Sequence, residues 1–289
     1  MALQRLPGTT APMHRWEGAD GVFIAGDSWG DPKGPLVLLM HGGGQTRHAW
    51  KGSGETLGAA GYHVAAFDAR GHGDSDWSAE GVYGDDVQIR DLQNVIKALG
   101  GRPPVLIGAS MGGAVSLGAV GGGHVDAHAL VLVDIGPIIE KEGADKVRAF
   151  MEQRPEGFDT LEEVAEAIAN YQPQRQRPRN LDGLAKNVRI APNGKYVWHW
   201  DPKRLGVTRR VMEREARLRE CSTKLRLPTL LVRGGLSDVL SEEGAKAFLE
   251  LCPHSEYVHV SDAGHMVAGD RNDAFANAAV DFLARVAPV

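Results

Sequence analysis

A serine, an aspartate and a histidine that lie far apart in the chain have the residue types needed for nucleophilic catalysis. Ser110 stands in Gly108-Ala-Ser-Met-Gly112, which matches the G-x-S-x-G pattern of a nucleophile elbow. A serine hydroxyl is a weak nucleophile at neutral pH and needs a base, and histidine is suited because its pKa lies near neutrality. A carboxylate would fix the tautomer of that histidine and stabilise its imidazolium. We therefore predict that Ser110, Asp238 and His265 act together to attack a carbonyl group.

The segments on either side of Ser110 predict a strand followed by a helix. The apolar run 105–107 is typical of a buried parallel strand, and the run 114–120 is typical of a helix. The turn between them must be tight, so Ser110 is expected in a strained backbone conformation at its tip. Glycines on both sides leave no side chain to collide where strand and helix approach each other. The N–H group of Met111, in the first helical turn, is then free to bind a developing oxyanion.

A glycine triplet supplies a candidate for the second oxyanion donor. His41-Gly-Gly-Gly44 directly follows the apolar run 36–40, which predicts a buried strand. Glycines here let the backbone approach a substrate closely and leave N–H groups directed at it. We predict the N–H group of Gly43 as the donor, with Gly44 as the near alternative.

Two aspartates between Ser110 and His265 could supply the carboxylate. Asp238 follows a predicted strand at 230–233, and Asp134 ends a predicted strand at 129–133. Both therefore lie at carboxyl ends of strands, where clefts form in open α/β sheets. Asp238 ends a Gly-Gly turn and has room to reach His265, whereas Asp134 comes directly off its strand and is expected to brace the segment that follows. We favour Asp238 and keep Asp134 as the alternative.

Residues 137–222 interrupt the alternation of strands and helices. This stretch contains charged helical segments at about 140–154, 161–171 and 209–219, together with the aromatic cluster 196–200. We predict an α/β core domain formed by residues 1–136 and 223–289, and a helical lid, residues 137–222, inserted over the sheet. The residues expected to line the substrate pocket are Gly44, Trp198, Trp200 and Met266.

The composition argues against several other classes of protein. The chain has 289 residues, 43% of them hydrophobic, and a formal net charge of −5, so no basic excess favours nucleic acid. No apolar run approaches the roughly 20 residues of a membrane span, and residues 1–13 lack the apolar core of a secretory signal. Cys221 and Cys252 are interpreted as free thiols in a reducing cytoplasm, and no metal-binding spacing is present. The expected partner is a small ester-like molecule, bound by a monomer or homodimer without nucleic acid or membrane.

These motifs together resemble those of the α/β-hydrolase superfamily. The resemblance runs from His41-Gly-Gly-Gly44 through the elbow at Ser110 and the turn 234–238 to Ala263-Gly-His265, and so covers nearly the whole chain. Only residues 137–222 match in position rather than in detail. The resemblance implies an eight-stranded, mostly parallel sheet flanked by helices. It also implies hydrolysis of an ester or similar bond without a metal or other cofactor.

Two positions indicate which branches of this superfamily the chain resembles. Epoxide hydrolases and haloalkane dehalogenases carry Asp at the elbow, so Ser110 disfavours those activities. Carbon–carbon hydrolases of ring-cleavage products share a Ser-Met-Gly-Gly elbow but usually have Trp after the catalytic histidine, where this chain has Met266. The leading hypothesis is a serine carboxylesterase-type hydrolase that forms an acyl-enzyme. The alternatives are a carbon–carbon hydrolase or perhydrolase on the same triad, and a ligand-binding or signalling module with vestigial turnover.

Overall fold

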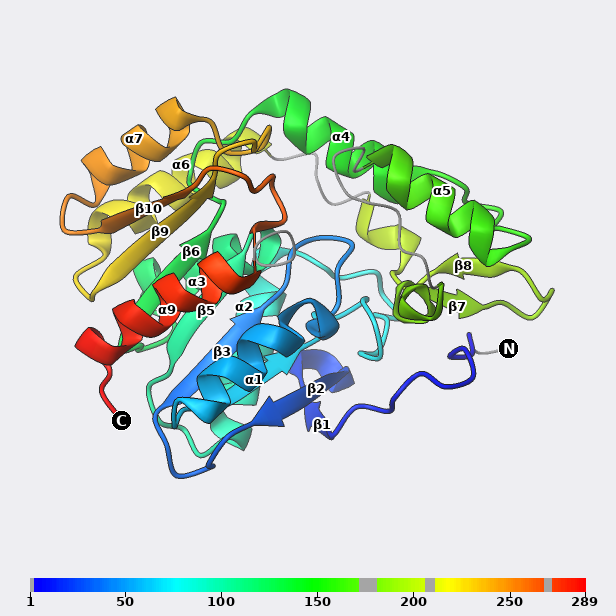
Figure 1. Cartoon of the computed structure of the whole chain (residues 1–289), viewed down its shortest axis with the longest axis horizontal. Helices are drawn as coiled ribbons and strands as arrows, with labels where there is room; N and C mark the ends of the chain where they lie inside the picture. The colour runs from blue at the N-terminus through cyan, green and yellow to red at the C-terminus, as the bar shows by residue number, and fades with distance from the viewer. Residues whose placement is uncertain (1–2, 172–180, 206–210, 268–271) are drawn as a thin grey trace.

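One mostly parallel, eight-stranded sheet forms the centre of the molecule (Figure 1). The computed structural model describes residues 3–171, 181–205, 211–267 and 272–289. The spatial order of the strands is β1-β2-β4-β3-β5-β6-β9-β10; β2 pairs antiparallel with both of its neighbours and the other pairs are parallel. The fold class predicted from the sequence is confirmed. In chain order the strands are β1 (His14–Glu17), β2 (Phe23–Trp29), β3 (Leu36–Met40), β4 (His63–Phe67), β5 (Val105–Ala109), β6 (Ala129–Val133), β9 (Thr229–Gly234) and β10 (Glu256–Val260).

Helices cover both faces of this sheet, which explains why its central strands are apolar along their whole length. Every residue of β3, β4 and β6 is buried. Residues of α1 and α9 pack on one face, and residues of α2, α3, α6 and α7 pack on the other (Figure 1). These helices are α1 (Lys51–Ala59), α2 (Asp85–Ala98), α3 (Met111–Gly121), α6 (Val211–Lys224), α7 (Glu242–Leu251) and α9 (Asn272–Val286).

The chain leaves the sheet after β6 and returns to it at β9. The intervening elements are α4 (Lys141–Glu152), α5 (Leu161–Tyr171), a 3-10 helix (Asp182–Asn187), the antiparallel pair β7 (Val188–Ile190) and β8 (Tyr196–Trp198), and α6. Figure 1 shows α4, α5 and the β7–β8 pair beyond one end of the sheet. A hydrophobic cluster of their own, which includes Phe158, Val164 and Trp198, holds them together.

Helix α6 differs in position from the other elements of this region. It packs against α3, and its residues Leu218 and Cys221 belong to the same hydrophobic core as the strands. Of the helix expected at 209–219, residues 209 and 210 lie outside the described residues. The division into a core domain and a lid of residues 137–222 stays a prediction.

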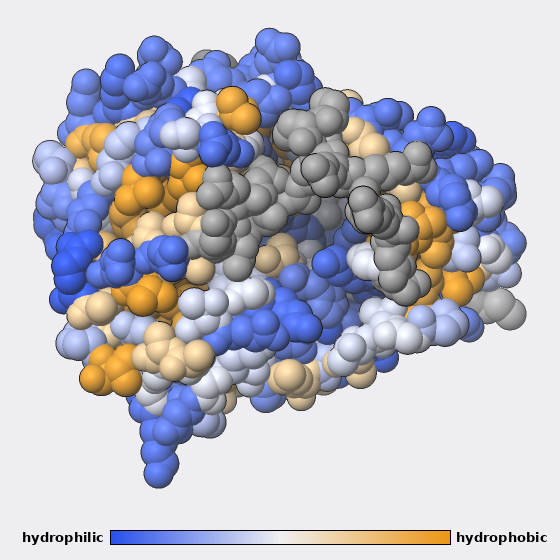
Figure 2. All heavy atoms as spheres, in the orientation of Figure 1, coloured by the Kyte–Doolittle hydropathy of each residue, from blue (hydrophilic) through white to orange (hydrophobic). Residues whose placement is uncertain are grey.

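In the part of the chain that the structure describes, no helix combines the length and apolar character that crossing a membrane requires. On the face shown in Figure 2, hydrophobic residues form separate patches among hydrophilic ones.

Candidate active site

The turn between β5 and α3 has the sharp geometry expected of a nucleophile elbow. Ser110 lies between the two elements with φ 46° and ψ −111°, a conformation that non-glycine residues rarely adopt. A Cβ atom on Gly108 would lie 2.5 Å from the Gly113 Cα, and one on Gly112 would lie 2.5 Å from the Met40 carbonyl oxygen. Both positions therefore require glycine, because the strand, the helix and β3 approach too closely for a side chain.

Two backbone hydrogen bonds tie this elbow to neighbouring strands. The N–H of Ser110 donates to the carbonyl of Val133, at the end of β6, with an N–O distance of 3.1 Å. The N–H of Gly112 donates to the carbonyl of His41, which follows β3, at 3.2 Å. The carboxyl ends of β3, β5 and β6 are thus held together around Ser110.

A cavity of about 750 Å³ lies beside Ser110. Ser110, Met111, Gly43 and His265 all line it, so the structure brings four of the residues predicted from the sequence to one site. Most of the exposed wall is apolar, as is usual for sites that bind small organic molecules. The apolar part comes largely from α4, α6 and the segment after β6, and includes Ile135, Pro137, Ile139, Val147, Met151 and Leu218.

His265 forms its hydrogen bond with Asp134. The Nδ1 atom of His265 lies 2.7 Å from Oδ2 of Asp134, whose side chain is fully buried. Asp134 also accepts a hydrogen bond from the N–H of Gly234, at 2.9 Å, and one from the hydroxyl of Ser237. These donors fix the carboxylate at the end of β6, and its bond to Nδ1 leaves Nε2 of His265 to exchange a proton with a reacting group.

Asp238 does not contact His265. The prediction that Asp238, rather than Asp134, lies against His265 is therefore wrong. The side chain of Asp238 is 50% exposed, and its Oδ2 lies 3.1 Å from Nζ of Lys146 on α4. The Gly-Gly turn that was expected to direct Asp238 inward instead brings Ser237 and Gly234 against Asp134. This turn therefore holds Asp134, and not Asp238, next to His265.

The glycine loop after β3 offers one free N–H group beside the elbow. A Cβ atom on Gly42 would lie 3.3 Å from Cβ of Ser110, so the loop packs directly against the elbow. The N–H of Gly42 donates to Oε1 of Gln45 at 2.8 Å, and that of Gly44 donates to Nε2 of His72 at 3.2 Å. The N–H groups of Gly43 and Met111 make no hydrogen bond to any of the described residues. Of the two glycines considered for the second oxyanion donor, Gly43 therefore has an N–H group without an acceptor among the described residues, and Gly44 does not.

Two buried histidines hold Gly44 from both sides. His72 accepts the hydrogen bond from its N–H, and Nε2 of His199 lies 3.3 Å from its carbonyl oxygen. Nδ1 of His199 accepts from the N–H of Gly73 at 2.9 Å, which requires the proton on Nε2 and makes His199 the donor to Gly44. Burial holds the pKa of His72 and of His199 well below its ordinary value. Both rings are therefore neutral at neutral pH, as this hydrogen-bond pattern requires.

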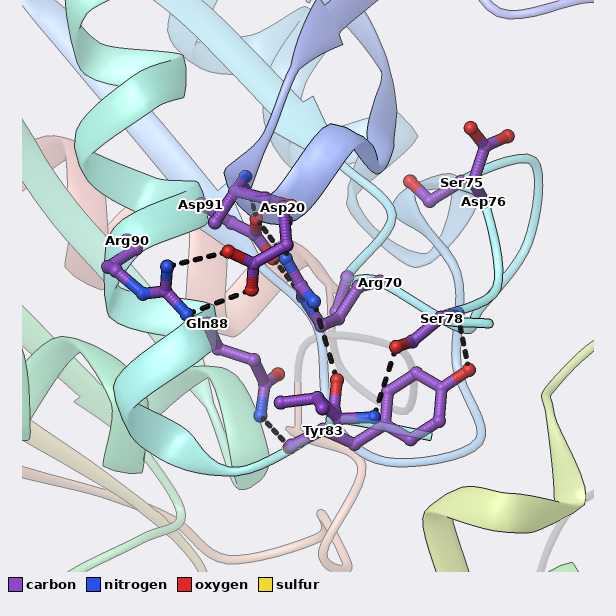
Figure 3. Close-up of polar contacts among 12 residues, drawn as sticks. Asp20, Arg70, Ser75, Asp76, Ser78, Tyr83, Gln88, Arg90 and Asp91 are labelled. Atoms are coloured by element: carbon purple, nitrogen blue, oxygen red, sulfur yellow. Dashed lines mark hydrogen bonds and ion pairs between the residues drawn. The ribbon is translucent and has the colours of Figure 1, made fainter. Parts of the chain in front are cut away.

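Buried ion pairs hold the loop that carries His72. Arg70 binds Asp91 of α2 through two hydrogen bonds, of 2.6 and 2.7 Å, and Figure 3 shows this pair beside Asp20 and Arg90. In the same loop, Asp68 forms a 2.6 Å ion pair with Arg47. Charges buried without partners are costly, so these pairs strongly favour one loop conformation.

The other residues predicted to line the pocket do not do so. Gly44, Trp198, Trp200 and Met266 are absent from the described lining of the cavity. The rings of Trp198 and Trp200 stack on each other at a centroid distance of 4.9 Å, inside the hydrophobic cluster next to α4. The sulfur of Met266 lies 2.8 Å from Nε2 of Gln45. The tryptophans were misassigned because aromatic residues fill cores as readily as they line pockets.

His72 and His199 had no predicted role in the site. His72 lies in the glycine-punctuated turn 68–75, and His199 lies inside the aromatic cluster 196–200. The signal available for His72 was its place in that turn. Within the described ranges, no group of three or more His, Cys, Asp or Glu side chains could hold a metal ion.

This fold and elbow define a class of protein, and comparison with known families agrees. The model of the alpha/beta hydrolase fold family matches residues 35–271. The chain belongs to this family.

Curated relatives of this chain include several ester-cleaving enzymes. It is 28% identical to the esterase Rv0045c of Mycobacterium tuberculosis over 273 residues, which are 91% of this chain and 87% of that protein. It is 26% identical to the 3-hydroxybutyrate-oligomer hydrolase of Cupriavidus necator over 255 residues, 84% of this chain and 86% of that protein. Among solved structures, E-2-(acetamidomethylene)succinate hydrolase superposes with a TM-score of 0.80 at 22% identity, covering 93% of this chain and 98% of the other. That last likeness concerns the fold alone.

Proposed function

We propose that the protein is a serine hydrolase that cleaves carboxylic esters through an acyl-enzyme. The observation that carries the proposal is the hydrogen bond from His265 to the buried carboxylate of Asp134, with His265 and Ser110 on the wall of one cavity. In this proposal Ser110 is the nucleophile, His265 the general base, and Asp134 the group that orients His265. Asp134 takes the role that the sequence alone favoured for Asp238.

The reaction begins when the hydroxyl oxygen of Ser110 attacks the ester carbonyl and transfers its proton to Nε2 of His265. The negative charge that develops on the carbonyl oxygen is stabilised by the N–H groups of Gly43 and Met111, which have no other acceptor among the described residues. The tetrahedral intermediate collapses, and His265 gives its proton to the departing alcohol. A water molecule, deprotonated by His265, then attacks the acyl-enzyme and releases the carboxylic acid.

The choice of an ester rests on the relatives and on the cavity. The names of the two relatives given above describe an esterase and a hydrolase of hydroxybutyrate oligomers. Another relative, from Mus musculus, is described as an sn-1-specific diacylglycerol lipase. The apolar wall between α4 and α6 suits the hydrocarbon part of such a substrate.

The test is pre-steady-state hydrolysis of p-nitrophenyl acetate and longer p-nitrophenyl esters. We expect a burst of p-nitrophenol that matches the enzyme concentration, because an activated ester acylates Ser110 faster than water hydrolyses the acyl-enzyme. Ser110→Ala should abolish the burst and lower turnover by roughly 10³-fold or more, while the melting temperature stays close to that of the wild type. A fluorophosphonate probe should label Ser110. Ester binding without a burst would instead favour a ligand-binding module, and labelling of another serine would contradict the assignment.

A further inference from the structure

A half-buried guanidinium group, that of Arg204, lies on the cavity wall next to the nucleophile. Nη2 of Arg204 lies 2.9 Å from the sulfur of Met111, the residue that directly follows Ser110. Nη1 donates to the carbonyl oxygen of Arg70 at 2.7 Å, and Cζ lies 5.0 Å from the centroid of the Tyr83 ring. In Figure 3 the Tyr83 hydroxyl points toward Ser78, whose N–H donates to it at 2.8 Å. Arg204 is thus held in one place beside the elbow.

Arg204 differs from the other arginines of the cavity wall in having no carboxylate at ion-pair distance among the described residues. Three further arginines line the cavity, and each has a carboxylate within ion-pair distance: Arg148 pairs with Glu152, Arg214 with Asp85, and Arg217 with Asp86. Among the described residues, no carboxylate lies within 4.0 Å of the Arg204 guanidinium, the distance that defines the other pairs.

Asp201 acts on Arg204 through its negative charge but does not form an ion pair with it within 4.0 Å. Its carboxylate accepts a hydrogen bond from the Tyr83 hydroxyl and another from the N–H of Lys203, at 2.9 Å. Burial lowers the pKa of Arg204 to about 10, so the group still carries its charge at neutral pH. A charged guanidinium taken out of water without a counter-ion is costly, and a thioether sulfur is only a weak acceptor. Its remaining donors are suited to an anion that enters the cavity.

We propose that Arg204 binds a carboxylate of the substrate, so that the preferred substrates are esters that also carry a free carboxylate, such as half-esters of dicarboxylic acids. This inference rests on the proposed function and adds a substrate class to it. The planar guanidinium can make two parallel hydrogen bonds to a carboxylate, which would align the ester carbonyl with Ser110. The apolar residues of α4 and α6 then accommodate the hydrocarbon chain between the two groups.

The first experiment compares two esters of equal shape. Methyl hydrogen adipate carries a carboxylate where methyl 6-methylheptanoate carries an isopropyl group, and acid release from both is followed in a pH-stat. We expect the wild type to favour the half-ester in kcat/KM. Arg204→Met should lower kcat/KM for the half-ester by roughly 10- to 100-fold and that for the neutral ester by less than about 3-fold. Arg204→Lys, which keeps the charge but not the paired donors, should fall between the two.

The matched control in this experiment is Arg148→Met. It also removes an arginine from the cavity wall, but one whose charge is paired with Glu152. It should change the ratio of the two kcat/KM values by less than about 3-fold. Equal losses on both esters in Arg204→Met, or no preference of the wild type for the half-ester, would overturn the inference and indicate that Arg204 only braces Arg70 and Tyr83.

The second experiment measures binding without turnover. Calorimetry of Ser110→Ala with methyl hydrogen adipate should show binding that weakens by roughly 10-fold or more in Ser110→Ala/Arg204→Met. If the wild type cleaves neither ester while this binding depends on Arg204, the proposed ester hydrolysis is wrong and the carboxylate site stands. If the wild type cleaves the neutral ester but Ser110→Ala binds the half-ester no better with Arg204 than without it, the hydrolysis stands and the carboxylate site is wrong.

Discussion

Nδ1 of His265 lies 2.7 Å from Oδ2 of Asp134, at the end of the strand next to the one that carries the nucleophile elbow. Asp134 itself has a positive φ of 53°, which is uncommon for a residue with a side chain. Its N–H donates to the carbonyl of Val232 at 2.7 Å, and its carboxylate accepts hydrogen bonds from the turn after β9. The strands β6 and β9 therefore hold this carboxylate in place for His265.

The first prediction distinguishes the two aspartates. Asp134→Asn should lower kcat by roughly 10²- to 10⁴-fold, because an amide cannot hold the imidazole in the required tautomer or stabilise its charged form. Asp238→Asn is the matched control, since its side chain pairs with Lys146 near the surface. It should change kcat by less than about 2-fold. The measurement is steady-state hydrolysis of p-nitrophenyl esters by both variants, with circular dichroism as the check on folding. A larger loss in Asp238→Asn would contradict the assignment.

The second prediction concerns the hydrogen bond from Gly44 to His72. His72→Leu removes the acceptor for the N–H of Gly44, so the neighbouring N–H of Gly43 should lose its fixed orientation. We expect kcat to fall roughly 10-fold or more while KM changes little, because oxyanion stabilisation acts mainly in the transition state. His72→Gln keeps an acceptor at a similar position and should recover much of the rate. A fall in melting temperature without a change in kcat would show that His72 serves packing alone.

A control for the His72 variants is His63→Leu. This histidine is also buried, but it lies at the amino end of β4, whereas the site forms at the carboxyl ends of the strands. Its substitution should alter stability and leave kcat within about 2-fold of the wild type.

The third prediction is a loss of stability in mild acid. Burial, reinforced by the charge of Arg189, holds the pKa of His199 well below its ordinary value of roughly 6.5. At a pH between the lowered pKa of the folded state and the ordinary pKa of the unfolded state, the unfolded chain binds a proton at this histidine and the folded chain does not. The free energy of unfolding therefore decreases as the pH falls below about 6.5. Each such histidine contributes a slope of about 1.4 kcal/mol per pH unit.

Urea unfolding at several pH values between about 5 and 8 measures this slope directly. His199→Gln should make it shallower, whereas His128→Gln, at an exposed position, should leave it unchanged. The same slope in the wild type and His199→Gln would contradict the assignment of a neutral, buried imidazole.

The fourth prediction concerns the stacked tryptophans. Trp198 is buried between Phe150 and Phe158, and its Nε1 donates to the carbonyl of Gln153 at 3.2 Å. Trp198→Ala should lower the free energy of unfolding by about 3–5 kcal/mol, because it leaves a large cavity and an unpaired carbonyl. The ratio of long-chain to short-chain ester turnover should stay within about 2-fold of the wild type, since Trp198 does not line the described cavity. A changed ratio at unchanged stability would restore the pocket role that the aromatic cluster first indicated.

Much of this protein is determined by local sequence. The apolar runs of β3, β5, β6 and β9 predict buried parallel strands, because only a strand covered on both faces is apolar at every position. The glycines around Ser110 predict a tight turn between strand and helix, since a side chain there would collide with the backbone. These features depend on residues that are neighbours in the chain, so the fold class and the elbow could be predicted.

Only the tertiary structure decided which residues meet across the sheet. Asp134 and Asp238 both follow strands and both lie between Ser110 and His265 in the chain, so their order could not separate them. The geometry of the turn after β9 separates them, because it directs Gly234 and Ser237 against Asp134 and leaves Asp238 to pair with Lys146 at the surface. The hydrogen bonds of Gly44 to His72 and His199, and the contact of the Arg204 guanidinium with Met111, likewise join segments tens of residues or more apart. Such contacts depend on how the whole chain packs, and no local pattern of residues encodes them.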